Sequence, residues 1–137
     1  MKLDSSAFVA DPELIHALEA RSTRIVCDEE RVLFHQGDSA TGLFVLRSGT
    51  ARLTMTSPKG DVLMSMPVSA GSVLGLPALV GNQPYSLTAS ALKGAELAFV
   101  TSQDFSSLMF STPSLSMSVL RILAAEVRNA RSAISGF

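Results

Sequence analysis

The sequence predicts a domain made mainly of antiparallel β-strands, either a sandwich or a jelly-roll barrel, with helices before and after the strands. The first observation is a series of short β-rich runs between residues 23 and 101, separated by turn signals at regular spacing. The second is helical patterning on both sides of that stretch. The length of 137 residues suits a single domain whose core needs neither a metal nor a disulfide. We therefore divide the chain into an N-terminal helix region at 1–22, a β body at 23–101 and C-terminal helices at 102–137.

The first helix is expected to follow Asp11. The carboxylate of Asp11 can accept a hydrogen bond from the first turn of a helix, and Pro12 suits the first helical position. Leu14, Ile15 and Leu18 share one face at helical spacing. The domain therefore opens with one short helix.

The β body begins where the hydrophobic period changes, near Thr23. Within residues 50–56, Ala51, Leu53 and Met55 alternate with polar residues, so one face of that strand is expected to point inward and the other into water. The uncharged stretch after it predicts a short turn of helix between two strands. The expected strands are residues 25–27, 31–34, 43–47, 50–56, 62–66, 86–92 and 95–101.

Two helices are expected in the last third of the chain. Ser102 is a suitable cap for a short helix to Phe110, and Pro113 suits the start of a long helix to about Ile134. One apolar stripe on the long helix has the 3, 4, 3, 4 spacing of a coiled-coil seam, and we expect it to join two copies of the chain in a homodimer. The alternative is that this stripe packs onto the barrel. The stripe consists of Leu120, Leu123, Val127, Ala130 and Ile134.

Charge and cysteine content exclude several classes of partner and cofactor. The chain has 11 Lys and Arg against 12 Asp and Glu, so it lacks the basic excess that binds a run of phosphates. The single cysteine, Cys27, excludes an internal disulfide, a cysteine-based zinc site and a four-cysteine iron–sulfur cluster. No secretory signal pattern follows Met1. We expect a cytoplasmic protein without a cofactor.

Catalysis is also disfavoured by the placement of ionisable residues. Residues 62–92 contain no Asp, Glu, Lys, Arg or His, and their prolines and glycines rule out a membrane-spanning helix. His16 and His35 are the two histidines and do not form a metal-binding pair, which argues against a cupin-type metalloenzyme. No nucleophile motif is present. We expect a protein that is not an enzyme.

Local strings in the β body carry a family resemblance. Residues 33–46 read Leu-Phe-His-Gln-Gly-Asp-Ser-Ala-Thr-Gly-Leu-Phe-Val-Leu, and Ser48, Gly49 and residues 50–53 follow. This stretch resembles the front half of a cyclic-nucleotide-binding domain, in particular the sensor domain of bacterial regulators of the catabolite-activator and fumarate-nitrate-reductase type. The resemblance covers the chain from Asp11 to Ile134. It implies a jelly-roll barrel, or double-stranded β-helix, with a long C-terminal helix.

The same resemblance places a phosphate-binding cassette at residues 75–79 and 84–89. In members that bind nucleotides, a Glu holds the ribose, helix N–H groups face the phosphate and an Arg neutralises it. Here Leu76 stands where the Glu is expected and Tyr85 where the Arg is expected. We therefore expect cyclic AMP and cyclic GMP to bind weakly, at millimolar concentration or worse. The resemblance implies ligand-binding positions at Gly75, Leu76, Ala78, Tyr85, Ser86 and Thr88, with Arg128 or Arg131 on the long helix as substitute phosphate partners.

Two functions remain open from the sequence. One is a stand-alone sensor of an apolar or neutral ligand, with Leu74, Leu76, Leu79 and Tyr85 as pocket walls, whose occupancy moves the long helix across the dimer seam. The other is a ligand-free interaction domain. Regulators of this family read DNA with a helix-turn-helix domain after the long helix, and this sequence contains no such segment before Phe137, so we expect no direct DNA binding.

Overall fold

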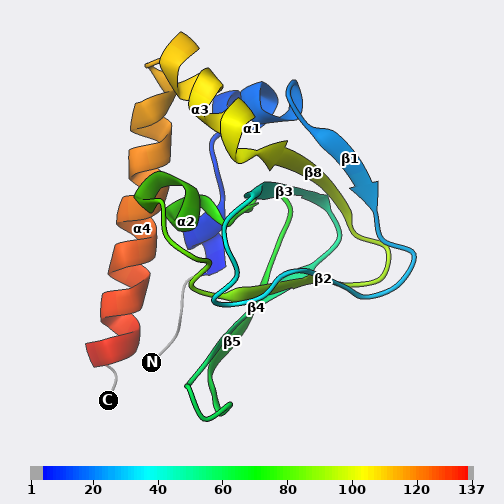
Figure 1. Ribbon diagram of the computed structural model, residues 1–137, viewed down its shortest axis with the longest axis vertical. Coiled ribbons are helices and arrows are strands. Elements are labelled where there is room, and N and C mark those ends of the chain that lie inside the picture. The colour runs from blue at the N-terminus through cyan, green and yellow to red at the C-terminus, as the bar shows by residue number, and fades with distance from the viewer. Residues whose placement is uncertain (1–4, 136–137) are drawn as a thin grey trace.

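The computed structural model describes residues 5–135, and the side chains of residues 6–129 among them. Two four-stranded sheets form the β body, one in the order β1-β8-β3-β6 and the other in the order β2-β7-β4-β5, and every pairing within them is antiparallel. The predicted mainly antiparallel β fold with flanking helices is confirmed. Figure 1 shows the long helix α4 standing along one side of this β body. No helix of the described residues is long and apolar enough to cross a membrane.

The elements follow one another from the N-terminal 3₁₀ turn to the long C-terminal helix. Two of them, the 3₁₀ turn and the two-residue strand β6, are too short to produce a periodic signal and were not predicted from the sequence. In order, they are η1 (Ser5–Phe8), α1 (Pro12–Glu19), β1 (Thr23–Val26), β2 (Arg31–Phe34), β3 (Gly42–Ser48), β4 (Ala51–Thr56), β5 (Val62–Val68), β6 (Val73–Leu74), α2 (Leu76–Gly81), β7 (Thr88–Ala91), β8 (Glu96–Thr101), α3 (Ser102–Ser111) and α4 (Leu115–Ser135).

The start of α1 agrees with its local sequence signals. The backbone N–H of Leu14 donates to Asp11 Oδ1 at 3.0 Å, and Pro12 occupies the first helical position. Leu14 and Leu18 are fully buried. The hydroxyl of Ser118 on α4 and the Leu14 N–H keep the pKa of Asp11 below its ordinary value. The cap of α1 thereby also contacts the long helix.

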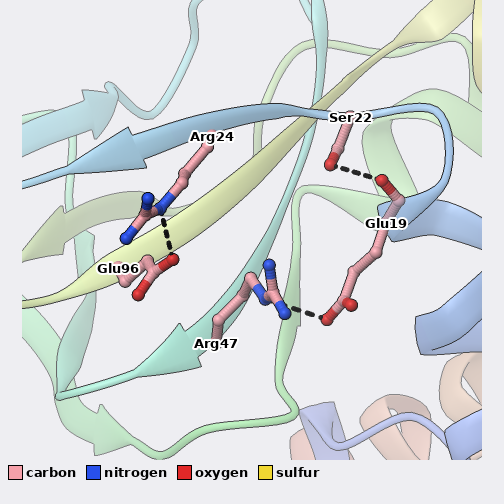
Figure 2. Close-up of polar contacts among 5 residues, drawn as sticks. All are labelled: Glu19, Ser22, Arg24, Arg47 and Glu96. Atoms are coloured by element: carbon pink, nitrogen blue, oxygen red, sulfur yellow. Dashed lines mark hydrogen bonds and ion pairs between the residues drawn. The ribbon is translucent and has the colours of Figure 1, made fainter.

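Polar contacts join the end of α1 to the first sheet (Figure 2). Arg47 on β3 pairs with Glu19 at 3.1 Å between Nε and Oε1, while the Ser22 hydroxyl donates to the Glu19 carbonyl at 2.8 Å. Arg24 on β1 pairs with Glu96 on the neighbouring strand β8. Since these side chains are partly exposed, each ion pair contributes only about 0–1 kcal/mol. The Arg47–Glu19 pair connects α1 to the sheet, whereas the Arg24–Glu96 pair lies within the sheet.

Two helix starts differ from the prediction. The cap of α3 is Thr101, whose hydroxyl accepts from the Asp104 N–H at 3.1 Å, and Ser102 is the first residue of the helix. The long helix begins at Leu115, because Pro113 lies in a tight turn in which the Leu115 N–H donates to the Thr112 carbonyl at 3.0 Å. In both cases neighbouring residues offer equivalent capping chemistry, and the path of the chain decides between them.

Gly42 has a different role from that of other turn glycines in the front half. Gly37 and Gly49 have φ values of +92° and +84°, as tight turns require. Gly42 does not have a positive φ; a Cβ atom there would lie 2.3 Å from the Val100 carbonyl oxygen on β8. The close approach of β3 and β8 therefore excludes any side chain at position 42.

Two apolar clusters fill the domain. The first includes Phe34, Leu53 and Leu97 and contains residues of both sheets. The second joins the sheet of β1 and β8 to the helices and includes Leu14 and Leu76. Helix α4 contributes to this second cluster with Leu115, Val119 and Ile122. The long helix is therefore held against the β body by one of its apolar stripes.

Candidate functional site

A cavity of about 30 Å³ lies between the β body, the cassette and α4. A space of this size holds one or two water molecules or a group of similar size. Helix α2, at the start of the cassette, and helix α4 both contribute to its walls. The lining residues are Phe8, Phe34, Leu53, Leu74, Gly75, Pro77, Ala78, Tyr85, Ser86, Leu87 and Glu126.

The cassette reaches the cavity at Gly75, which has a left-handed backbone conformation. Gly75 has a φ of +94° and precedes α2 directly, and a Cβ atom at this position would lie 3.0 Å from Cε1 of the Tyr85 ring. A glycine at position 75 therefore permits the left-handed turn and leaves room for the Tyr85 ring beside it. Leu76 and Leu79 were expected as pocket walls, but they pack in the second apolar cluster and do not line the cavity. The reason is that α2 turns these two side chains toward the opposite side from Ala78, which does line it.

Tyr85 closes the cavity from inside the barrel. Its ring stacks on Phe34 with centroids 3.9 Å apart and an angle of 14° between the planes. Its hydroxyl donates to the Gly42 carbonyl at 2.6 Å and accepts from the N–H groups of Thr41 and Gly42, each at 3.2 Å. One donor and two acceptor positions complete the capacity of a phenol, so this hydroxyl has no further hydrogen bond to offer a ligand.

The other predicted ligand-binding residues lie at the mouth or away from the cavity. Ser86 is exposed and lines the cavity. Thr88 begins β7, and its hydroxyl accepts from the Gln36 N–H at 2.9 Å. Arg128 is exposed and does not line the cavity, and the side chain of Arg131 lies outside the described residues. The predicted strand at residues 86–92 is shortened to Thr88–Ala91 because Ser86 and Leu87 bend around the cavity.

Glu126 on α4 is a cavity residue that the sequence analysis missed. Its Oε2 atom is buried and has no hydrogen-bond partner within the described part of the chain. Burial raises the pKa of Glu126 from 4.5 to about 8, because the apolar surroundings disfavour the ionised carboxylate. A signal for it was present: Glu126 continues the 4, 3, 4 spacing of Leu115, Val119 and Ile122, so it occupies a position on the stripe that faces the barrel.

The packing of α4 partly buries one residue of the predicted dimer seam and leaves two others exposed. Leu120 and Val127 are 56% and 52% exposed, and Leu123 is partly buried against the second apolar cluster. The side chains of Ala130 and Ile134 lie outside the described residues. The alternative that the stripe packs onto the barrel therefore holds for Leu123, whereas Leu120 and Val127 face away from it.

Comparisons with known proteins agree on one family. A family model described as "Cyclic nucleotide-binding domain" matches residues 24–112. The crystal structure of the catabolite activator protein of Thermus thermophilus superimposes with a TM-score of 0.78 at 23% identity, covering 91% of this chain and 59% of that one. This likeness confirms the jelly-roll form of the β fold.

Two curated relatives match at the sequence level. An uncharacterised NTE family protein of Mycobacterium tuberculosis is 25% identical over 123 residues, which cover 90% of this chain and 20% of the relative. The fumarate and nitrate reduction regulatory protein of Vibrio cholerae is 27% identical over 96 residues, which cover 70% of this chain and 38% of the relative. The chain thus spans well under half the length of both relatives.

Proposed function

Since the chain belongs to the cyclic nucleotide-binding domain family, we propose that it is a regulatory sensor domain with an altered ligand. Two similar proteins have names that describe regulators, and this supports a regulatory function over a catalytic one. They are the catabolite activator protein and the fumarate and nitrate reduction regulatory protein. The proposal includes a cytoplasmic location and no direct contact of these residues with DNA. The pocket takes a ligand other than cyclic AMP or cyclic GMP, and the signal passes through α4 to a second copy of the chain.

The charge of the cavity is the observation that carries this proposal. A buried phosphate needs a cation or several N–H donors, and without them it loses a few kcal/mol of interaction while its desolvation cost remains. Of the described side chains that line the cavity, Glu126 alone is an Asp, Glu, Lys, Arg or His, and it is an acid. At about 1.4 kcal/mol per factor of ten, the loss reduces micromolar binding of a cyclic nucleotide to millimolar or weaker.

Tyr85 supports the same conclusion by its position. The sequence resemblance aligns Tyr85 with the Arg that neutralises the phosphate in nucleotide-binding members, and the Tyr85 ring stacks on Phe34. Its hydroxyl is already bonded to the backbone of Thr41 and Gly42. A phosphate at this place would meet an aromatic ring without a free donor.

Helix α4 is the element that can carry a signal. On one side Glu126 reaches the cavity, and on another side Leu120 and Val127 are exposed. A molecule that enters the cavity contacts α4 directly, so a shift of this helix changes the position of the exposed stripe. We expect that stripe to form the interface of a homodimer.

A second candidate function is a ligand-free dimerisation or interaction domain. The volume of the cavity, about 30 Å³, favours it, because pockets for small molecules measure roughly 300–1,000 Å³. The two candidates differ in whether any small molecule stabilises the domain. Thermal unfolding in the presence of a panel of small molecules distinguishes them.

Isothermal titration with cyclic AMP and cyclic GMP tests the altered ligand. We expect no saturable binding by the wild-type chain at ligand concentrations up to about 1 mM. A Glu126→Gln/Tyr85→Arg variant removes the acid and supplies a cation, so it should bind more tightly than wild type once circular dichroism shows that it is folded. Micromolar binding by the wild-type chain would overturn the proposal.

The dimer is tested with a matched pair of valines. Val127 on α4 and Val26 on β1 are 52% and 54% exposed. Val127→Asp should convert dimer to monomer in sedimentation velocity without unfolding the barrel, and Val26→Asp should leave the dimer intact. A wild-type chain that is monomeric at high concentration, or a Val127→Asp variant that stays dimeric, would show that this stripe is not the interface.

A further inference from the structure

The cavity combines apolar walls with a carboxyl group that has one buried oxygen without a hydrogen-bond partner among the described residues. Phe8, Phe34, Leu53 and Leu74 form much of the wall, and Glu126 reaches it from α4. The buried Oε2 of Glu126 accepts no hydrogen bond from any residue that the structure describes. Burying a carboxyl group without a partner costs stability. A buried polar group that costs the fold stability and lines a cavity is a candidate for a binding role.

The chemistry of the wall decides which ligand can satisfy Glu126. A carboxylate accepts hydrogen bonds and attracts positive charge, so its natural partner is an N–H donor on a cation. The Tyr85 hydroxyl is committed to the backbone of Gly42. Arg121 and Arg128 on the same helix are exposed and do not line the cavity. The protein side of the cavity therefore offers an acceptor for a donor that comes from outside.

The size of the cavity limits the part of the ligand that enters it. A volume of about 30 Å³ accommodates an ammonium group with one or two carbon atoms. The exposed Ser86 and the half-buried Leu87 line the same cavity, so they mark its mouth. A longer apolar chain can extend past these two residues toward the surface.

We propose that this pocket binds a small primary ammonium ion with a short apolar chain, which donates to the carboxylate of Glu126. This inference rests on the proposed function and names the ligand class of the same site. The ligand contacts α4 through Glu126 and contacts the β body through Phe34 and Leu53. Its binding therefore clamps the long helix to the barrel, which links occupancy to the exposed stripe on α4.

The charge state of Glu126 gives the proposal a pH signature. Because the pKa of Glu126 is raised to about 8, the carboxyl group is mostly protonated at pH 7 and mostly ionised at pH 9. An alkylammonium ion keeps its charge at both pH values, since amines of this kind ionise near the lysine value of about 10.4. Among the side chains of residues 6–129, no other Asp, Glu, Lys, Arg or His lines the cavity. Affinity for the ammonium ion should rise about tenfold from pH 7 to pH 9.

The experiment titrates n-butylammonium chloride into the wild-type chain, with 1-butanol and sodium butyrate at equal ionic strength as comparisons. Binding is followed by calorimetry and by the fluorescence of Tyr85, the single tyrosine of a chain without tryptophan. We expect saturable binding of n-butylammonium, weaker binding of 1-butanol and none of butyrate. The Glu126→Gln variant should bind n-butylammonium at least tenfold more weakly than wild type and should bind 1-butanol with unchanged affinity. The exposed control Glu29→Gln should bind both compounds as wild type does.

Each result has a defined meaning for the two proposals. Failure of n-butylammonium to bind at pH 9, or equal binding by Glu126→Gln and wild type, overturns the ammonium ligand. If cyclic nucleotides also fail to bind, the sensor proposal with an altered ligand stands. Micromolar binding of cyclic AMP would overturn both proposals together.

Discussion

Replacing Glu126 by Gln should change how the stability of the domain depends on pH. In the unfolded chain the carboxyl group ionises near its ordinary pKa of 4.5, whereas in the folded domain burial raises the pKa of Glu126 to about 8. Between these two pH values the unfolded chain releases its proton and the folded chain keeps it. Rising pH therefore favours the unfolded state of the wild type, and the penalty is complete above about pH 8. Gln has a similar shape and does not ionise, so the variant lacks this dependence.

The magnitude follows from the pKa values. One pKa unit corresponds to about 1.4 kcal/mol, so the penalty on wild type is about 1 kcal/mol at pH 5 and about 3 kcal/mol at pH 7. Between pH 5 and pH 7, the free energy of unfolding of Glu126→Gln should therefore rise by about 2 kcal/mol relative to that of wild type. Such a gain is a large part of the stability of a domain of this size.

Urea denaturation at several pH values between 5 and 8 measures this difference. The unfolding is followed by circular dichroism, in buffers free of amines so that the cavity stays without a cation. Glu29→Gln is the control, because Glu29 is exposed in a turn and its replacement should leave the pH profile unchanged. A constant difference between wild type and Glu126→Gln from pH 5 to pH 8 would refute the reasoning, since it would mean that the carboxyl group is solvated or paired.

Three further predictions concern the frame of the site, each measured as a free energy of unfolding in urea. Tyr85→Phe removes the hydroxyl that bonds to the Gly42 backbone and should cost about 1–3 kcal/mol; no loss would mean that water replaces it fully. Gly42→Ala should prevent stable folding, because its Cβ would lie 2.3 Å from the Val100 carbonyl oxygen, whereas Gly60→Ala, with open space but a φ of +92°, should cost only about 1 kcal/mol. Asp11→Ala should cost about 1 kcal/mol through the lost cap of α1, and an unchanged value would show that Asp11 does not support the helix.

Much of the fold could be predicted because its signals are local. The cap at Asp11, the inward alternation of Ala51 and Leu53, and the turn glycines Gly37 and Gly49 each depend on neighbours in the chain. Where local chemistry was ambiguous, the prediction was off by one or two residues, as at the starts of α3 and α4. The family resemblance likewise depends on contiguous strings of the front half.

The candidate site was predicted only in part. Of the positions that the resemblance implied for ligand binding, Gly75, Ala78, Tyr85 and Ser86 line the cavity. The sequence did not reveal that Leu76 turns away from the cavity, since the direction of a side chain on a short helix depends on how that helix is docked.

The sequence by itself determined most of the strands and helices and the family. Only the tertiary structure decided which stripe of α4 faces the barrel. Two apolar stripes are present on that helix, and packing selects the one that continues through Ile122 to Glu126, leaving Leu120 and Val127 exposed. The contact between Tyr85 and Gly42 joins residues 43 positions apart in the chain. Periodicity along one chain segment carries no information on such rotations and long-range contacts, because they depend on how separate elements fit together in space.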